Sequence, residues 1–240
     1  GVVVIETKRA PQGQTLVSYV GSLDLEMPDL TSYDLTNALE KLEVERREGY
    51  YESLGTFVDD KVDYMQLYNE RLRRAKEGLD TYWLSKPLRT VFNHKHSVYV
   101  EGGSDNLRFG IDLKYDNQDG VMKGSYRDRT GVGFSVDYRF KKLQIKNYIS
   151  YNVTRAKESP YGSFRDYTKK LPYDEYKDEM GNYLKQTRMW HDGSVGDIQN
   201  PLYEATLSSF ERQSYWELMD NISVNWYVLD VLQLKGDFSV

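Results

Sequence analysis

Residues 107–116 read LRFGIDLKYD and residues 131–140 read GVGFSVDYRF, and in both stretches apolar and polar side chains alternate one by one. The alternation continues through KLQIKNYISYNV at 142–153. A side-chain period of two is that of a β-strand, because successive side chains of an extended backbone point to opposite faces. The polar positions include charges, which indicates a face in water. The pattern fits an antiparallel sheet that is wet on one side, and it also fits a transmembrane barrel with a wet lumen.

Aromatic residues lie where each apolar face would end. Three of them fall near the rim of the expected short turns, namely Tyr138, Phe140 and Trp226. Three fall at the opposite rim, namely Tyr115, Tyr151 and Trp216. Two aromatic girdles around an apolar belt are typical of barrels in a bilayer, whereas a soluble β-sandwich would use the same face as its core. Asn147 and Asp220 interrupt the belt.

The alternation assigns side chains to the two faces of such a barrel. We expect lipid contact for Leu107, Phe109, Ile111, Leu113, Phe134, Val136, Ile145 and Ile149. We expect a position in the lumen for Arg108, Asp112, Lys114, Asp137, Arg139 and Lys146.

The connections between the strand-like stretches are very unequal. Long excursions run over about 25–92 and 155–213, a moderate one spans 117–128, and short turns follow Glu101, Phe140 and Leu229. Outer-membrane barrels combine short periplasmic turns with long extracellular loops, and a sandwich has no reason to place every long loop at one end. We therefore interpret the chain as all-β, with about seven strands of a large antiparallel transmembrane barrel.

Composition agrees with this interpretation. The chain of 240 residues contains 21 tyrosines and no cysteine, which excludes disulfides and thiolate metal sites. Its net charge of -5 argues against nucleic acid as a partner. A mean hydropathy of -0.70 is compatible with a barrel, since only alternate residues of a barrel strand meet lipid. Both ends interrupt strand-like runs, VVVIETK and LQLKGDFSV, so we expect a segment of a larger protein.

Several ordered motifs resemble one family. GVVVIETKRA at 1–10 resembles the last plug strand of SusC/RagA-type TonB-dependent outer-membrane transporters, although Glu6 departs from the usual threonine. The first barrel strand of the family resembles VSYVGSLDLEMPDLTSYDLTNA, and its next strands resemble HKHSVYVEGGSDNLRFGIDLKYDNQDGVMKGSYRDRTGVGFSVDYRF. SPYGSFRDYTKKLPYDEYKDEMGNYLK resembles its tyrosine-rich extracellular loop. The resemblance implies the end of a plug domain at 1–10 and the N-terminal part of the barrel at 11–240.

The resemblance also implies the function. A SusD-like surface lipoprotein would cap the extracellular mouth and deliver an oligosaccharide or a peptide, and TonB would pull on the plug through a region outside this segment. The implied location is the outer membrane of a Gram-negative bacterium, with lipid around the barrel. The alternative is a soluble β-sheet protein that binds glycans without transport.

Two stretches of the first long loop have helical spacing, at 33–50 and 59–79. Asp59 and Asp60 suit a first helical turn and Gly78 suits a helix end. Their apolar faces would either cover the rim of the barrel or dock against the capping lipoprotein; amphipathic helices usually pack on their own chain, which favours the first account.

Aromatic residues of the second long loop are the candidate substrate contacts. A flat ring can cover the apolar C–H surface of a sugar or a peptide side chain while polar neighbours form hydrogen bonds. Our candidates are Tyr161, Tyr167 and Trp190; most tyrosines of this loop would instead pin the loop to itself. We expect no catalytic residues, no metal site and no cofactor. His94 and His96 lack a third ligand, and the acidic residues around 174–182 lack calcium-loop spacing.

Overall fold

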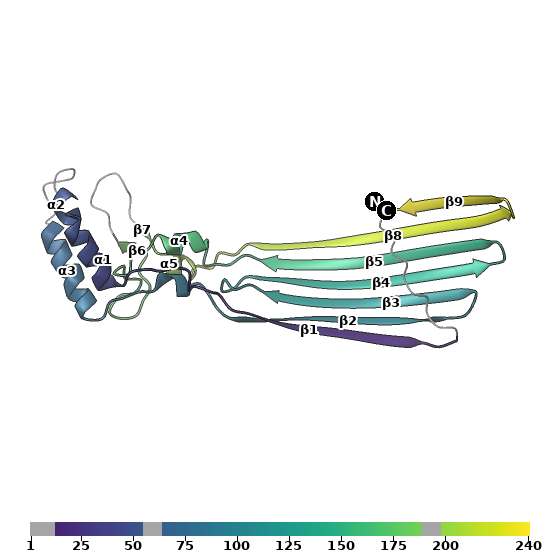
Figure 1. Ribbon diagram of the computed structural model, residues 1–240, viewed down its shortest axis with the longest axis horizontal. Helices are drawn as coiled ribbons and strands as arrows, with labels where there is room; N and C mark the ends of the chain where they lie inside the picture. Colours follow the sequence, from purple (N-terminus) through teal and green to yellow (C-terminus); the bar gives the residue numbers. More distant parts are fainter. Residues whose placement is uncertain (1–12, 55–63, 189–197) are drawn as a thin grey trace.

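The computed structural model describes residues 13–54, 64–188 and 198–240. Its main element is a seven-stranded antiparallel sheet, whose strands lie side by side in chain order (Figure 1). The strands are β1 (Leu16–Glu26), β2 (Val91–Gly103), β3 (Leu107–Asp119), β4 (Tyr126–Phe140), β5 (Leu143–Lys157), β8 (Arg212–Leu229) and β9 (Leu232–Ser239). The expected all-β architecture of about seven strands is thereby confirmed. The expected plug strand at 1–10 lies outside the described residues.

The register places the predicted apolar positions on one face of the sheet. Ile111 lies opposite Phe134, and Phe134 lies opposite Ile149 in the next strand. Leu113 and Phe134 are 45% and 42% exposed. The two hydrophobic clusters of the described residues contain no residue of this face. A soluble sandwich would need a second layer over it, and the described chain has none; the apolar face is free to contact lipid.

All long connections leave the same end of the sheet, as Figure 1 shows. They cover residues 27–90, 120–125 and 158–211, and the short turns at 104–106, 141–142 and 230–231 lie at the other end. The loop asymmetry is as predicted. The middle connection is shorter than the expected 117–128, because β3 and β4 keep pairing until Asp119 lies opposite Tyr126.

The described part of the first long connection contains the α-helices α1 (Ala38–Arg47), α2 (Tyr50–Leu54) and α3 (Tyr64–Lys76). Asn37 caps α1 in a capping box, in which its side chain accepts from the backbone of Glu40 while the Glu40 side chain accepts from the backbone of Asn37. Gly78, with φ of 106°, follows α3 as predicted. Asp59 and Asp60 lie outside the described residues. No helix in the described part of the chain is long and apolar enough to cross a membrane.

The connections contain further elements that the sequence did not predict. A 3-10 helix, η1 (Trp83–Ser85), closes the first, and the second holds α4 (Phe164–Thr168), β6 (Gln186–Arg188), β7 (Ile198–Gln199) and α5 (Pro201–Glu204). The buried residues form two clusters, each with members from both long connections. One cluster is Ala38, Leu42, Tyr51, Tyr64, Tyr68, Ala75 and Tyr173, and the other is Trp83, Leu84, Tyr167 and Leu202. We call the described parts of the three connections the cap.

Candidate functional site

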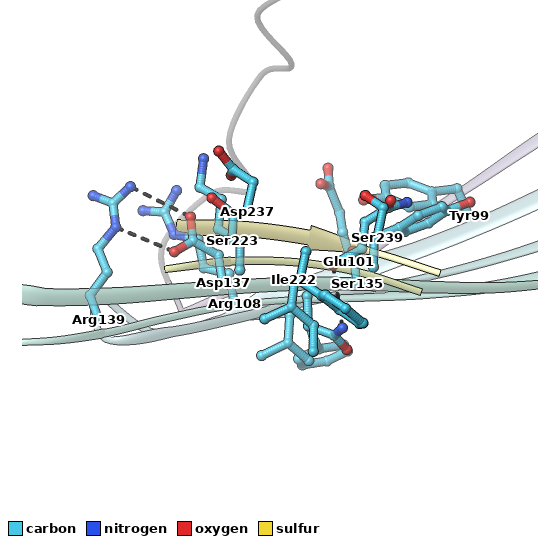
Figure 2. Close-up of a pocket in the computed structure, with 17 residues that line it drawn as sticks. Tyr99, Glu101, Arg108, Ser135, Asp137, Arg139, Ile222, Ser223, Asp237 and Ser239 are labelled. Carbon is cyan, nitrogen blue, oxygen red and sulfur yellow. Dashed lines mark hydrogen bonds and ion pairs between the residues drawn. The ribbon is translucent and has the colours of Figure 1, made fainter. Parts of the chain in front are cut away.

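The polar face of the sheet forms a wall that crosses β3 to β9 in register. Arg108 lies opposite Asp137, Asp137 opposite Lys146, Lys146 opposite Ser223 and Ser223 opposite Asp237. Figure 2 shows this wall near the short-turn end: Ile222 points to one side of the sheet, and the labelled polar residues project on the other. All six charged residues predicted for the lumen fall on this face. We call it the polar wall.

Hydrogen bonds and ion pairs hold several charges of the polar wall in place. The Nε2 of Gln144 donates to both oxygens of Asp137 at 2.8 and 3.0 Å, and the guanidinium of Arg139 lies 3.4 Å from the same carboxylate. Asp112 accepts from the hydroxyl of Tyr148 at 3.4 Å and lies 3.3 Å from Lys114 Nζ. The wall therefore presents mixed charges that largely neutralise one another.

Near the short-turn end the sheet holds a shallow hollow of about 430 Å³. Its charged lining residues are Glu101, Arg108, Asp137, Arg139, Lys146 and Asp237. Tyr99 and Tyr148 line it from β2 and β5, the strands on either side of β3 and β4. The Nη1 atom of Arg108 is buried and has no hydrogen-bond partner among the described residues.

Two glycines make room for these tyrosines. A Cβ on Gly110 would lie 2.5 Å from the hydroxyl oxygen of Tyr99 and 3.0 Å from its Cζ. A Cβ on Gly133 would lie 2.8 Å from the hydroxyl oxygen of Tyr148 and 2.1 Å from Oδ1 of Asp112. The Tyr99 phenol thus lies over Gly110 of the neighbouring strand, and the Tyr148 hydroxyl lies beside Gly133 together with the Asp112 carboxylate. A side chain at either glycine would collide with these groups.

A buried polar network joins the long connections within the cap. Glu45 of α1 is 7% exposed and accepts from the hydroxyls of Tyr51 at 2.9 Å and Tyr173 at 2.8 Å. Arg71 of α3 donates to the Tyr51 hydroxyl at 2.9 Å, and its guanidinium lies 4.8 Å from the centroid of the Tyr173 ring. Lys41 Nζ lies 3.4 Å from Glu45. None of these side chains has a buried polar atom without a hydrogen-bond partner.

Further contacts join the same connections nearer the sheet. The indole N–H of Trp83 donates to the carbonyl of Leu171 at 3.0 Å, and the backbone N–H of Thr81 donates to the carbonyl of Pro172 at 2.7 Å. Arg74 and Glu175 form an ion pair. The helices therefore pack on the second long connection of their own chain and not on the rim of the sheet, which corrects the rim contact favoured from the sequence.

The three predicted contact residues differ in their positions. Tyr167 is 1% exposed and its hydroxyl donates to the carbonyl of Tyr161 at 3.0 Å. Burial raises the pKa of the Tyr167 phenol well above its usual range. Tyr161 is half-buried against the second cluster, with Lys123 Nζ 5.8 Å from its ring centroid. Trp190 lies outside the described residues. In this conformation Tyr167 offers no surface to a ligand, whereas Tyr161 does.

The described residues include no group of three metal-ligating side chains. His94 and His96 lie on the apolar face, where the Tyr19 hydroxyl and His96 Nδ1 are hydrogen-bonded at 2.7 Å and the His94 and Tyr115 rings are 5.8 Å apart. These imidazoles extend the aromatic girdle that contains Tyr115, at the rim opposite the short turns. In the acidic stretch, Asp178 closes a turn by accepting from the backbone of Met180 and Asn182.

Sequence reasoning missed Tyr99 and Tyr148. A signal was available, because both tyrosines occupy polar-parity positions of alternating strands and each faces a glycine or serine across the ladder. The buried pair Glu45 and Arg71 left no such signal, since both look like ordinary surface charges of amphipathic helices.

Comparison with known proteins places this geometry in context. No protein-family model matches the chain. The TonB-dependent receptor SusC of Bacteroides thetaiotaomicron is 24% identical over 154 residues, which are 64% of this chain and 13% of that protein.

Two solved structures share the fold at 14% identity. The structure of the RagAB peptide transporter matches 92% of this chain and 27% of its own, with a TM-score of 0.69. The RagAB peptide importer in the 'closed-closed' state matches 94% of this chain and 28% of its own, with a TM-score of 0.71. The chain thus spans less than a third of the proteins that it matches. The shared architecture shows that the chain has the fold of a barrel segment of these transporters, and the similarity to SusC and the motifs of the sequence both resemble the SusC/RagA-type TonB-dependent family.

Proposed function

We propose that the protein containing this chain imports oligosaccharides or peptides across the outer membrane in a TonB-dependent manner. The observation that carries the proposal is the separation of the two faces of the sheet. An uncovered apolar face suits lipid, and the polar wall with its mixed charges suits a wet passage. The cap lies at one end of the sheet. In an outer-membrane barrel this end would be the extracellular one, because substrate recognition takes place on that side.

The partners are part of the same proposal. A SusD-like lipoprotein would sit over the cap, which forms one folded unit at the mouth. TonB would act through a plug region outside the described residues, for which 1–10 would be the last strand before the barrel at 11–240. The named relatives are a receptor and a transporter, and we propose no catalytic activity for this chain.

Aromatic side chains of the second long connection would contact the substrate at the mouth. Tyr161 is half-buried and accessible, and Trp190 is the second candidate. Tyr167 would take part only after the cap opens, since it is 1% exposed. Alanine substitution of all three should slow uptake if they act together, and unchanged uptake with normal surface expression would make them scaffold.

A deletion of the parent gene tests the function. We expect the deletion strain to lose uptake of a defined oligosaccharide or peptide fraction. Deletion of TonB in a strain that keeps the parent gene should have the same effect. Normal growth and uptake of every fraction in the deletion strain would contradict import as the function.

A further inference from the structure

Three basic side chains lie on the apolar face of the sheet, just beyond the aromatic girdle at the end opposite the short turns. Arg155 and Lys157 end this face on β5, and Arg212 begins it on β8, directly opposite Lys157. They occupy the same alternate positions as Tyr151 and Trp216, the girdle residues of these two strands, whose ring centroids are 6.2 Å apart. We call Arg155, Lys157 and Arg212 the basic rim.

Strand length places the basic rim at the edge of a bilayer. On β5 the apolar positions run from Leu143 to Val153, and Trp226 and Trp216 lie opposite these two residues on β8. Ten residue steps correspond to about 33 Å of extended strand. A strand that is tilted by about 40° covers about 25 Å of height with this length, which is the apolar band of a transmembrane barrel. Arg155 follows Val153 at the next position of the face, so the basic rim lies at the level of the lipid headgroups.

The chain offers the basic rim no carboxylate partner. Among the described residues, none of the three side chains forms an ion pair. Asp128 lies opposite Arg155 on β4, and its Oδ1 accepts from the amide of Asn117 at 2.9 Å. Glu158 and Glu211 pair one step beyond the rim, and alternation turns them to the other face. The basic rim therefore presents net positive charge to the medium over the apolar face.

Three cations of the polar wall in the same half of the sheet differ in this respect. Lys95 and Arg129 lie 4.0 and 3.8 Å from the carboxylate of Asp116, and Lys114 lies 3.3 Å from that of Asp112. These cations have anionic partners within the chain, whereas the cations of the basic rim have none. The partner of the basic rim is therefore a different molecule.

The surroundings of the basic rim select a lipid as this partner. A molecule that contacts both the rim and the apolar positions next to it must join an anion to an apolar chain, as an anionic lipid does. Guanidinium groups bind phosphate through two parallel hydrogen bonds, and a lysine adds a point charge. A free phosphate ion would gain only exposed ion pairs, which are weak, whereas a lipid also buries its acyl chains against the apolar face.

An acidic segment of a protein partner fits this position less well. In Figure 1, β5 and β8 run side by side up to the cap, whose second connection covers residues 158–211. The basic rim lies on the strand side of that connection, between the cap and the apolar band. A protein over the cap would lie beyond residues 158–211 and not beside the strands.

We propose that the basic rim binds the phosphate group of an anionic lipid in the leaflet on the side of the cap. Arg155 and Arg212 donate to the phosphate oxygens, and Lys157 adds the third positive charge. The acyl chains of this lipid lie along the apolar face, past Val153 and Trp216. The proposal goes beyond import and does not rest on it; it requires only that the apolar face lies in a bilayer.

Lipid titration of the full-length protein in detergent tests the site, followed by native mass spectrometry. The probe is lipid A, an acylated glucosamine disaccharide that carries phosphate, and we expect saturable binding. The variant Arg155→Gln/Lys157→Gln/Arg212→Gln should weaken this binding about hundredfold, because each cation near a lipid surface contributes about a factor of five. Arg155→Gln alone should weaken it about fivefold, and it carries the test if the triple variant does not fold.

The polar wall supplies a matched control. Lys95→Gln/Lys114→Gln/Arg129→Gln also removes three positive charges from the sheet, but from the opposite face, and should leave the affinity for lipid A unchanged. Lipid A without its phosphate should bind the natural protein about as weakly as phosphorylated lipid A binds the triple rim variant.

Several outcomes would overturn the site. Equal affinity for lipid A in the natural protein and the triple rim variant, equal losses in the rim and wall variants, or equal affinity for lipid A without phosphate would each contradict a phosphate site at the rim. Tight binding of inorganic phosphate without lipid, lost in the rim variant, would make the rim a site for the free ion. Loss of a co-purifying lipoprotein in the rim variant, with lipid A binding unchanged, would assign the rim to a protein. None of these results decides import, which uptake in the deletion strain tests separately.

Discussion

Glu45 shows how single residues determine the cap. Its carboxylate is buried, a position that is costly for a charge without partners. Tyr51, Tyr173 and Lys41 supply those partners, and Arg71 completes the network through Tyr51. The phenols must stay protonated to donate, so the network depends on pH.

Alkaline pH should loosen the cap. Burial raises the pKa of Tyr51 to about 12 and that of Tyr173 far above its usual range. The positive charge of Arg71 lowers both pKa values, but by less than burial raises them. In an unfolded cap both phenols ionise near pH 10. Their contribution to stability is therefore complete below about pH 10 and is lost as pH rises toward 12 and beyond.

The loss can be followed by proteolysis of residues 27–90 and by tyrosinate absorbance as functions of pH. The variant Tyr51→Phe/Tyr173→Phe should show a flatter dependence, since it has no phenol to ionise at these positions. An identical pH dependence in both proteins would contradict the prediction.

Asn147 and Asp220 form a polar pair on the apolar face. The amide of Asn147 donates to Asp220 Oδ1 at 2.5 Å and to the carbonyl of Asn221 at 3.3 Å. Ile149 lies directly opposite Asp220, and Ile222 directly opposite Asn147, so the pair sits within the belt that meets lipid. The sequence predicted that these residues interrupt the belt, but only the register shows that they satisfy each other.

Replacing one residue of this pair should lower the free energy of unfolding more than replacing both. Asn147→Leu leaves the carboxylate of Asp220 without its donor and should lower the free energy of unfolding by about 2 kcal/mol. The double variant Asn147→Leu/Asp220→Leu should regain that loss, because leucines suit a lipid-facing position. Urea unfolding of the full-length protein in detergent measures both. Additive losses in the double variant would show that the pair is not coupled.

At the scale of elements, alternation predicted the strands well and the loops poorly. β3, β4 and β5 follow from a period of two because each strand meets one medium on each face. The cap elements η1, α4 and α5 are short, and they fold only because residues distant in sequence pack on them. Trp83 and Tyr167, for example, belong to one cluster although they come from different connections. Local sequence patterns do not indicate such long-range contacts.

The candidate site divides in the same way. Arg108, Asp137 and Lys146 could be assigned to the wet face from alternation, and the register confirms it. Burial of Tyr167 could not be foreseen, since a tyrosine in a polar loop gives the same signal whether it packs or binds.

Glu45 should couple the local stability of the first long connection to that of the second. Glu45→Leu removes the acceptor shared by Tyr51 of α2 and Tyr173 and should increase cleavage within both 27–90 and 158–211, as a loss of about 2 kcal/mol in local stability predicts. Glu43→Gln lies on the same helix but pairs only with Arg46 and Arg47 at the surface, so it should leave both rates unchanged. Faster cleavage confined to 27–90 would mean that the connections unfold independently.

At the scale of the whole molecule, the described chain is dominated by one seven-stranded sheet with an uncovered apolar face. Trp216 and Trp226 are 67% and 50% exposed, and the sheet ends in β1 and β9, each paired on one side within the described chain. Unpaired edges and exposed aromatic residues both promote association in water. The cap is the only part of the described chain with buried hydrophobic clusters of its own.

Residues 1–240 expressed alone should therefore aggregate or stay unfolded in detergent-free buffer, because neither lipid nor further strands cover the sheet. Detergent micelles should increase the soluble fraction by covering the apolar face. They would not supply neighbouring strands for the free edges of β1 and β9. Size-exclusion chromatography with light scattering, followed by thermal unfolding, distinguishes these states. Residues 27–90 and 158–211 should show some protection from protease even so, since their contacts are internal to the cap. A monomer that unfolds cooperatively in detergent-free buffer would mean that the apolar face finds cover within the chain, and the barrel interpretation would be wrong.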